Sequence, residues 1–149
     1  MISKKTKYAL KALMALARNY SSQQPTQIAD LAASERLPKK FLELILLDLK
    51  NEGLLVSKKG RGGGYRLARS PDLVPVGQVI RILEGTLSPL PCLSHRAYQK
   101  CEECLDEGTC AIRSVMKEVR EATVRILDQT SLQNMLERAA ATKPISFSI

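Results

Sequence analysis

The sequence contains no tryptophan, only two phenylalanines and a single histidine among its 149 residues. Apolar residues still make up 44% of the chain, so it can bury a core, and that core must be mainly aliphatic. An enzyme that works by acid–base chemistry needs a nucleophile paired with a base, and the sequence shows no such arrangement. We therefore expect a protein that is not an enzyme.

Long apolar runs are also missing, and no stretch is long enough to span a membrane. Near the N-terminus, Lys4, Lys5 and Lys7 precede an apolar run in the manner of a secretory signal. Lys11 interrupts that run, which favours an amphipathic helix over a signal peptide. We therefore expect a cytoplasmic protein with no membrane partner.

Positive charge is concentrated in one half of the chain. Residues 1–70 hold 14 lysines and arginines against 5 acidic residues, a net charge of +9. Residues 71–149 hold 9 against 10, a net charge of −1. A basic half of this kind indicates a polyanionic partner, with nucleic acid favoured over an anionic membrane surface.

Apolar periodicity and turn residues predict a mainly α-helical fold with one small β-hairpin. Thr26 is expected to cap the second helix, Pro38 to lie in the first turn of the third, and Gly53 to end it. The predicted helices cover residues 4–19, 27–34, 38–52, 76–85 and 111–128, with a last one from about 131, and the predicted strands cover 54–58 and 64–68.

A helix, a short helix, a tight turn, a second helix and a hairpin follow one another in the order of a winged helix-turn-helix. The second helix of such a pair lies in the major groove of DNA, where its N-terminal end contacts bases and phosphates. Here that end carries Lys39 and Lys40, suited to phosphates or guanine edges, and Glu43, which can accept a hydrogen bond from cytosine. The alternative is a solvated face on which Glu43 pairs with one of the lysines.

The predicted wing has a cationic, glycine-rich tip formed by Lys59, Gly60, Arg61 and Gly62. Glycines allow the backbone to approach a surface closely, and Arg61 is placed to enter a narrow minor groove of DNA. The spacing of a Walker phosphate loop is absent, which argues against a nucleotide site. The alternative is a mobile hairpin whose charges only keep the protein in solution.

All four cysteines lie in one polar segment: Cys92, Cys101, Cys104 and Cys110. In the expected reducing compartment, clustered thiols indicate a metal or redox site more than structural disulfides. Three alternatives remain open: an iron–sulfur cluster, a zinc ion held by four thiolates, and a metal-free thiol–disulfide switch. An iron–sulfur electron-transfer protein is a less favoured function for the same cysteines.

The chain resembles the IscR/NsrR-type winged helix-turn-helix transcriptional regulators, the Rrf2 family, over nearly its whole length. The resemblance implies a DNA-binding domain over 1–85, a cysteine-rich sensor loop over 86–110, and a dimerisation helix with a C-terminal tail over 111–149. It also implies a homodimer that binds a pseudo-palindromic operator in double-stranded DNA. The motifs that carry the resemblance are Lys7-Tyr8-Ala9-Leu10, Ile28-Ala29, Phe41-Leu42-Glu43, Gly53-Leu54, Lys59 to Leu67, and Leu83-Glu84-Gly85.

The resemblance further implies that Cys92, Cys104 and Cys110 are cluster ligands, while Cys101 is additional. The residues that supply the fourth ligand in two groups of relatives are both replaced in this chain. Arg113 stands where IscR has a histidine, and Lys7 stands where the nitric-oxide sensors have an aspartate. Cys101 is the simplest replacement and His95 the next. We therefore expect a regulator that senses redox state, iron or iron–sulfur status through a two-iron cluster, with a four-iron cluster as the alternative. A repressor is the expected type, and an activator stays open as the alternative.

Overall fold

The computed structural model describes residues 2–142, and it confirms a mainly helical fold with a two-stranded antiparallel hairpin. Residues 143–149 of the predicted C-terminal tail lie outside the described part. Within residues 2–142, no helix combines the length and apolar character that a bilayer crossing requires. The elements are α1 (Lys4–Arg18), α2 (Ile28–Glu35), α3 (Lys39–Asn51), β1 (Leu55–Lys58), β2 (Gly64–Leu67), α4 (Val76–Glu84), α5 (Ala111–Gln129) and α6 (Leu132–Ala141).

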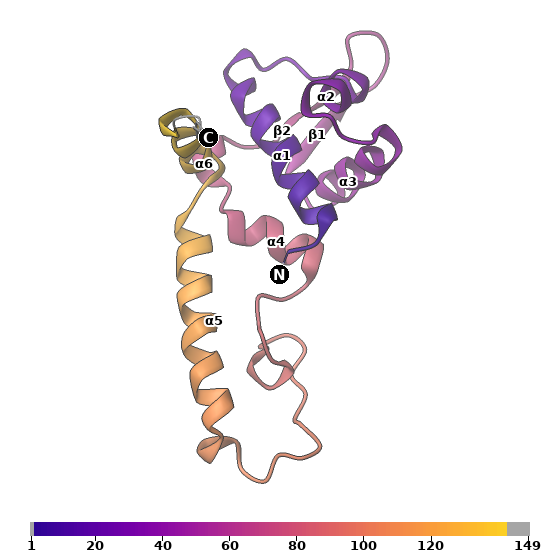
Figure 1. The fold of residues 1–149 in the computed structure, drawn as a ribbon. Helices are drawn as coiled ribbons and strands as arrows, with labels where there is room; N and C mark the ends of the chain where they lie inside the picture. The colour runs from indigo at the N-terminus through magenta and orange to yellow at the C-terminus, as the bar shows by residue number, and fades with distance from the viewer. Residues whose placement is uncertain (1, 143–149) are drawn as a thin grey trace, which may run out of the picture.

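Helices α1 to α4 and the hairpin form one packed unit, the reader domain, comprising residues 2–85 (Figure 1). Its core is aliphatic, as the composition requires, and is built from leucines such as Leu13, Leu46 and Leu49, all completely buried. At the core margin, the rings of Tyr8 on α1 and Phe41 on α3 meet edge to face with centroids 5.7 Å apart. This contact helps to hold α3 against α1.

The hairpin gains a third short partner from the segment before α2. The backbone N–H of Thr26 donates to the carbonyl of Tyr65 at 2.8 Å, and the N–H of Tyr65 donates to the carbonyl of Thr26 at 2.9 Å. A Cβ at Gly64 would lie 2.2 Å from the Thr26 carbonyl oxygen, so only glycine permits this approach. The expectation that Thr26 caps α2 is wrong: Gln27 occupies the N-cap, and Thr26 is held by the hairpin instead.

The end of α4 is tied to the start of α1 by Glu84. Its carboxylate accepts hydrogen bonds from the Ser3 backbone N–H at 2.7 Å and from the Thr6 hydroxyl at 2.5 Å. These bonds hold the pKa of Glu84 at about 2, well below its ordinary value. Gly85 ends the helix with a positive φ of 86° that favours glycine.

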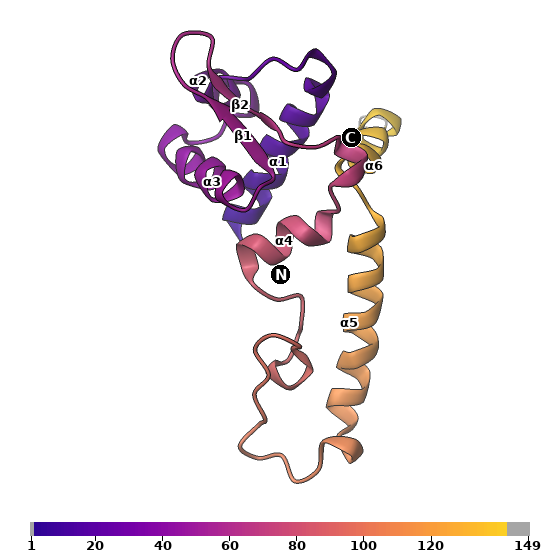
Figure 2. The ribbon, with the colours of Figure 1, turned by 180° about the vertical axis from the view of Figure 1, so that it is seen from behind.

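After Gly85 the chain leaves the reader domain as the cysteine loop, residues 86–110, and returns along α5 (Figure 2). The following helix, α6, packs beside α1, and Leu132 at its start is completely buried in the reader core. The Val76 N–H donates to the Thr130 carbonyl at 2.8 Å, and the Leu132 N–H donates to the Val74 carbonyl at 3.0 Å. The C-terminal helix therefore stabilises the reader domain.

Candidate DNA interface and metal centre

One face of α3 is exposed and carries the side chains that we expect to contact DNA. Lys39, Lys40 and Glu43 all face solvent, whereas the opposite face of the helix is buried in the core. Among residues 2–142, none of the ion pairs includes Glu43. The salt bridge offered as an alternative is therefore not formed, and Glu43 keeps both carboxylate oxygens available as acceptors. Its contact with a base stays a prediction.

Two leucines on α3 lie outside the buried face of the helix and are exposed to solvent. Leu44 is 61% exposed and lies one turn after Lys40, and Leu47 is 45% exposed. Apolar side chains on a recognition helix can contact the methyl group of thymine. Sequence reasoning did not single them out as DNA contacts. The available signal was that both leucines lie outside the apolar face that the helix needs for packing on the core. We add Leu44 to the expected DNA surface.

The tip of the wing is exposed and tightly turned. Lys59, Gly60, Arg61 and Gly62 all face solvent, and the two glycines adopt positive φ angles of 87° and 72°. The Gly63 N–H closes the turn by donating to the Gly60 carbonyl at 3.0 Å. These glycines are thus required by the turn itself. None of the ion pairs in residues 2–142 involves Arg61, so its guanidinium is free to bind a phosphate or enter a groove.

Helix α3 and the wing lie on the side of the reader domain that faces away from α5 and α6 (Figures 1 and 2). The cysteine loop projects away from this side, below α4 in both views. Any influence of the loop on the expected DNA surface must therefore pass through α4, α5 or a second copy of the chain.

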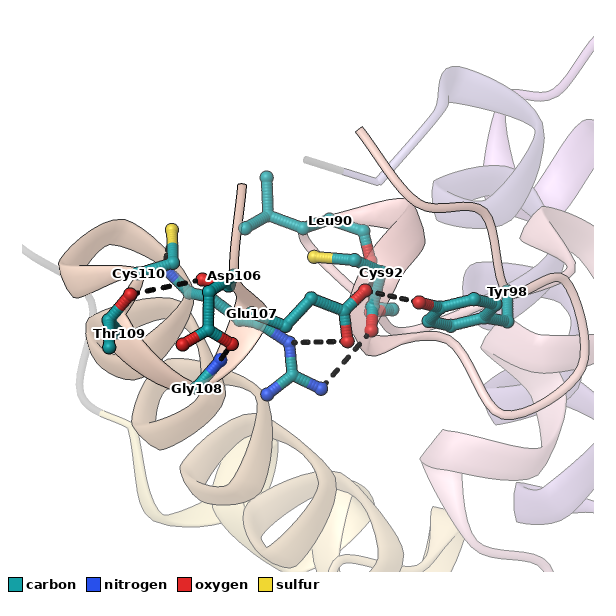
Figure 3. Close-up of polar contacts among 10 residues, drawn as sticks. Leu90, Cys92, Tyr98, Asp106, Glu107, Gly108, Thr109 and Cys110 are labelled. Carbon is teal, nitrogen blue, oxygen red and sulfur yellow. Dashed lines mark hydrogen bonds and ion pairs between the residues drawn. The ribbon is translucent and has the colours of Figure 1, made fainter. Parts of the chain in front are cut away.

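The four cysteines differ in exposure but open on one cavity. Cys92, in a short 3-10 turn, is buried, Cys104 and Cys110 are half-buried, and Cys101 is exposed. All four line a cavity of about 480 Å³, with Glu103, Asp106 and Glu107 at its rim. Figure 3 shows Cys92 and Cys110, from the two ends of the loop, with their sulfur atoms apart. In residues 2–142, no three cysteine, histidine or acidic side chains converge tightly enough for a single metal ion.

Arg113, which replaces a histidine ligand of IscR, holds the two ends of the loop together. Its guanidinium donates to the Cys92 carbonyl at 3.4 Å, and its Nε lies 3.9 Å from a carboxylate oxygen of Glu107. The other Glu107 oxygen accepts a hydrogen bond from the Tyr98 hydroxyl (Figure 3). The arginine is therefore a polar clamp. Sequence reasoning excluded it as a ligand but did not find this role, because only the fold brings the Cys92 carbonyl, 21 residues earlier, to Arg113.

Two of the thiols have distinct local surroundings. The Cys110 sulfur caps α5 by accepting a hydrogen bond from the Arg113 backbone N–H at 3.4 Å. The pKa of Cys101 is raised by desolvation and by the neighbouring Cys92, Glu103, Cys104 and Cys110. These neighbours therefore favour the thiol form of Cys101 in the metal-free protein. Four thiols on one cavity fit an iron–sulfur cluster as a donor set.

His95, the other expected fourth ligand, lines a different cavity. This cavity lies between α4, the start of the cysteine loop and α5, and His95 lines it together with Arg81, Arg96 and Arg120. Cys101 instead shares the cavity of the other three cysteines. This arrangement favours Cys101 over His95, although the ligand set itself stays a prediction.

Comparisons with known proteins agree over nearly the whole chain. The family model of Rrf2, an iron-dependent transcriptional regulator, matches residues 2–138. An rrf2-like HTH-type transcriptional regulator of Rhodobacter capsulatus is 44% identical over 138 residues, covering 91% of this chain and 92% of that protein. The solved structure of CymR, the global cysteine regulator of B. subtilis, has a TM-score of 0.77 and 30% identity, covering 93% of this chain and 97% of its own. T. potens IscR has a TM-score of 0.74 and 27% identity, covering 97% and 93% respectively.

Proposed function

Because this chain belongs to the Rrf2 family of transcriptional regulators, we propose that it regulates transcription in response to redox state, iron or iron–sulfur status. The sensor is an iron–sulfur cluster held by Cys92, Cys101, Cys104 and Cys110. One observation carries the proposal: all four thiols open on a single cavity, in a loop that adjoins the two helices α4 and α5. The family's role in transcription also supports a cytoplasmic location.

The DNA partner is a duplex read by α3 and the wing. Lys39, Lys40 and Glu43 on α3 contact the major groove, and Lys59 to Gly62 contact phosphates or the minor groove. Their exposure and the net charge of +9 in residues 1–70 support this assignment. The resulting binding weakens steeply as salt concentration rises, because each phosphate contact releases a counterion.

The working form is a homodimer joined through α5. In the single chain, Ile112, Val115, Val119 and Ile126 are between 46% and 67% exposed, at spacings of three, four and seven residues along one helix. A stripe of this kind is costly in water and suits a second copy of the same helix. A two-fold dimer pairs two recognition helices and so matches a pseudo-palindromic operator.

The two ends of the loop connect the thiols to the rest of the molecule. Cys92 follows α4 closely, and Cys110 is the N-cap of α5. Cys92 and Cys110 would hold the cluster from the two ends of the loop, and the cluster would supply chemistry that responds to redox state and iron supply. With both cysteines held, the loop would be fixed between α4 and α5. Without the cluster the loop would be free to reorder, which would shift the spacing of the two reader domains.

The deciding experiment purifies the protein anaerobically, records its absorption spectrum, and counts iron, zinc and sulfide. Operators are then selected from random duplexes, and the affinities of the cluster-loaded and metal-free forms are compared at one salt concentration. We expect iron and sulfide in similar amounts and at least a tenfold difference in affinity. Equal affinities would refute cluster-controlled regulation.

The two alternatives to an iron–sulfur cluster, a zinc ion and a metal-free thiol–disulfide switch, give different results in the same experiment. A zinc regulator contains zinc without sulfide and has no visible colour. A thiol–disulfide switch contains no metal and changes affinity with the thiol redox buffer instead. A DNA affinity that does not change with salt would contradict the DNA-binding assignment itself.

A further inference from the structure

A second cavity, of about 180 Å³, lies between α4, the start of the cysteine loop and α5. Its lining includes Arg81 from α4, His95 and Arg96 from the loop, and Arg120 from α5. The hydroxyl-bearing residues Thr86 and Ser94 also line it, and no carboxylate does. The concentration of cationic side chains is unusual here, because residues 71–149 as a whole carry a net charge of −1.

The positive charges in this cavity are only partly compensated. Arg81 forms a paired contact with Asp128, at 2.7 and 2.8 Å, which raises the pKa of the arginine. Neither Arg96 nor Arg120 takes part in any ion pair within residues 2–142, although Arg120 is half-buried on α5. Like charges that converge on a concave surface raise its potential and attract anions.

We propose that this cavity binds an oxyanion of the phosphate class, either free or as a small organic ester. Guanidinium groups bind the oxygens of such anions through paired, charge-assisted hydrogen bonds, and hydroxyl groups of serine and threonine add further donors. The cavity is smaller than the roughly 300 to 1,000 Å³ of pockets for drug-sized ligands, so it selects a small anion.

The bound anion joins the start of the cysteine loop to α5, beside α4. Arg81 belongs to the reader domain and is held by Asp128, Arg96 follows Cys92 by four residues, and Arg120 lies in the middle of α5. An anion held by Arg96 and Arg120, next to Arg81, fixes the start of the cysteine loop against α5. Anion binding is thus a second way to order the region where α4, the cysteine loop and α5 meet. It can be tested without a metal in the cysteine cavity.

The test uses the metal-free full-length protein in a titration with sodium phosphate, and with sodium chloride at the same ionic strength. Binding is followed by calorimetry and by the midpoint of thermal unfolding, which a ligand of the folded state raises. Glycerol 2-phosphate forms a second arm: binding of both probes identifies a site that accepts esters, and binding of phosphate alone a site for the free anion. We expect saturable binding of phosphate with no counterpart in chloride.

Variants place the binding in this cavity. Arg120→Gln and Arg96→Gln should each weaken phosphate binding at least tenfold, while Arg125→Gln, on an exposed part of the same helix, should leave it unchanged. Both cavity variants should retain the wild-type affinity for random duplex DNA, since α3 and the wing are untouched. No phosphate-specific binding, or equal binding by the wild type and Arg120→Gln, would overturn the proposal.

Discussion

The reader domain buries most of its large apolar side chains in one core, whereas the cysteine loop leaves two of its own largely exposed. Leu13, Ile45 and Leu46 are completely buried, while Leu105 is 98% exposed and Tyr98 is 56% exposed. The loop is held by isolated turns and by the polar contacts of Arg113 and Glu107. A segment with few apolar contacts reorders at low free-energy cost. The reader domain, completed by Leu132 of α6, is therefore held by its packed core, whereas the loop is held mainly by polar contacts.

The largest effect is expected from removing a thiol from the loop. Cys104→Ala should abolish visible colour and iron content in the anaerobically purified protein, because three cysteine ligands do not complete the proposed site. Cys101→Ala should do the same if Cys101 is the fourth ligand. Absorption spectra and iron counts measure both changes. Full colour in the Cys104 variant would remove that residue from the ligand set.

The same comparison can be tested by truncating one leucine in each region of the metal-free protein. Leu46→Ala should lower the free energy of unfolding by about 2 to 5 kcal/mol, because it leaves a cavity in a packed core. Leu105→Ala should change it by less than about 0.5 kcal/mol, because the side chain is exposed. Urea denaturation measures both values. A large loss from Leu105→Ala would mean that the loop is packed in solution.

The next largest effect is expected from a substitution in the wing, which should change DNA affinity and leave the stability of the fold unchanged. Arg61→Ala should weaken binding to all duplex sequences and reduce the slope of log affinity against log salt by about 1 if Arg61 contacts a phosphate. Arg125→Ala on α5 is the matched control and should leave the slope unchanged. Fluorescence anisotropy across a salt series measures both. If the loss falls mainly on sites with narrow minor grooves, Arg61 reads groove shape instead.

The smallest effect concerns Glu84 and depends on pH. Its pKa is about 2 in the folded protein and near 4.5 otherwise, so its stabilising effect is present above pH 4.5 and is lost as pH falls through 2. Glu84→Gln should lower stability at pH 7 by less than about 1 kcal/mol, because the group is exposed to solvent. The difference between the two proteins in thermal unfolding should shrink toward pH 2. A constant difference would contradict this role.

Sequence patterns predicted the helices and strands to within one or two residues, because apolar periodicity, Pro38, Gly53 and Gly85 define local structure. They failed where distant segments meet. Thr26 looked like a helix cap because its partner, Tyr65, lies on the hairpin. The Arg113 clamp and the arginine cavity were missed for the same reason. The spacing of the cysteines indicated a common site and ranked Cys101 before His95, and the fold adds that His95 lines a different cavity.

The bridge between Pro75 and Ser131 has a consequence for how this architecture can vary. It joins the start of α4 to the start of α6, so the intervening chain both departs from and rejoins the same packed unit. The hydrogen bonds from Arg81 to Asp128 add a second link, between α4 and the end of α5. Such a segment is attached in the manner of an inserted domain, whose length can change without altering its host. The cysteine loop is therefore replaceable: other loops with other chemistry can be carried by an unchanged reader domain.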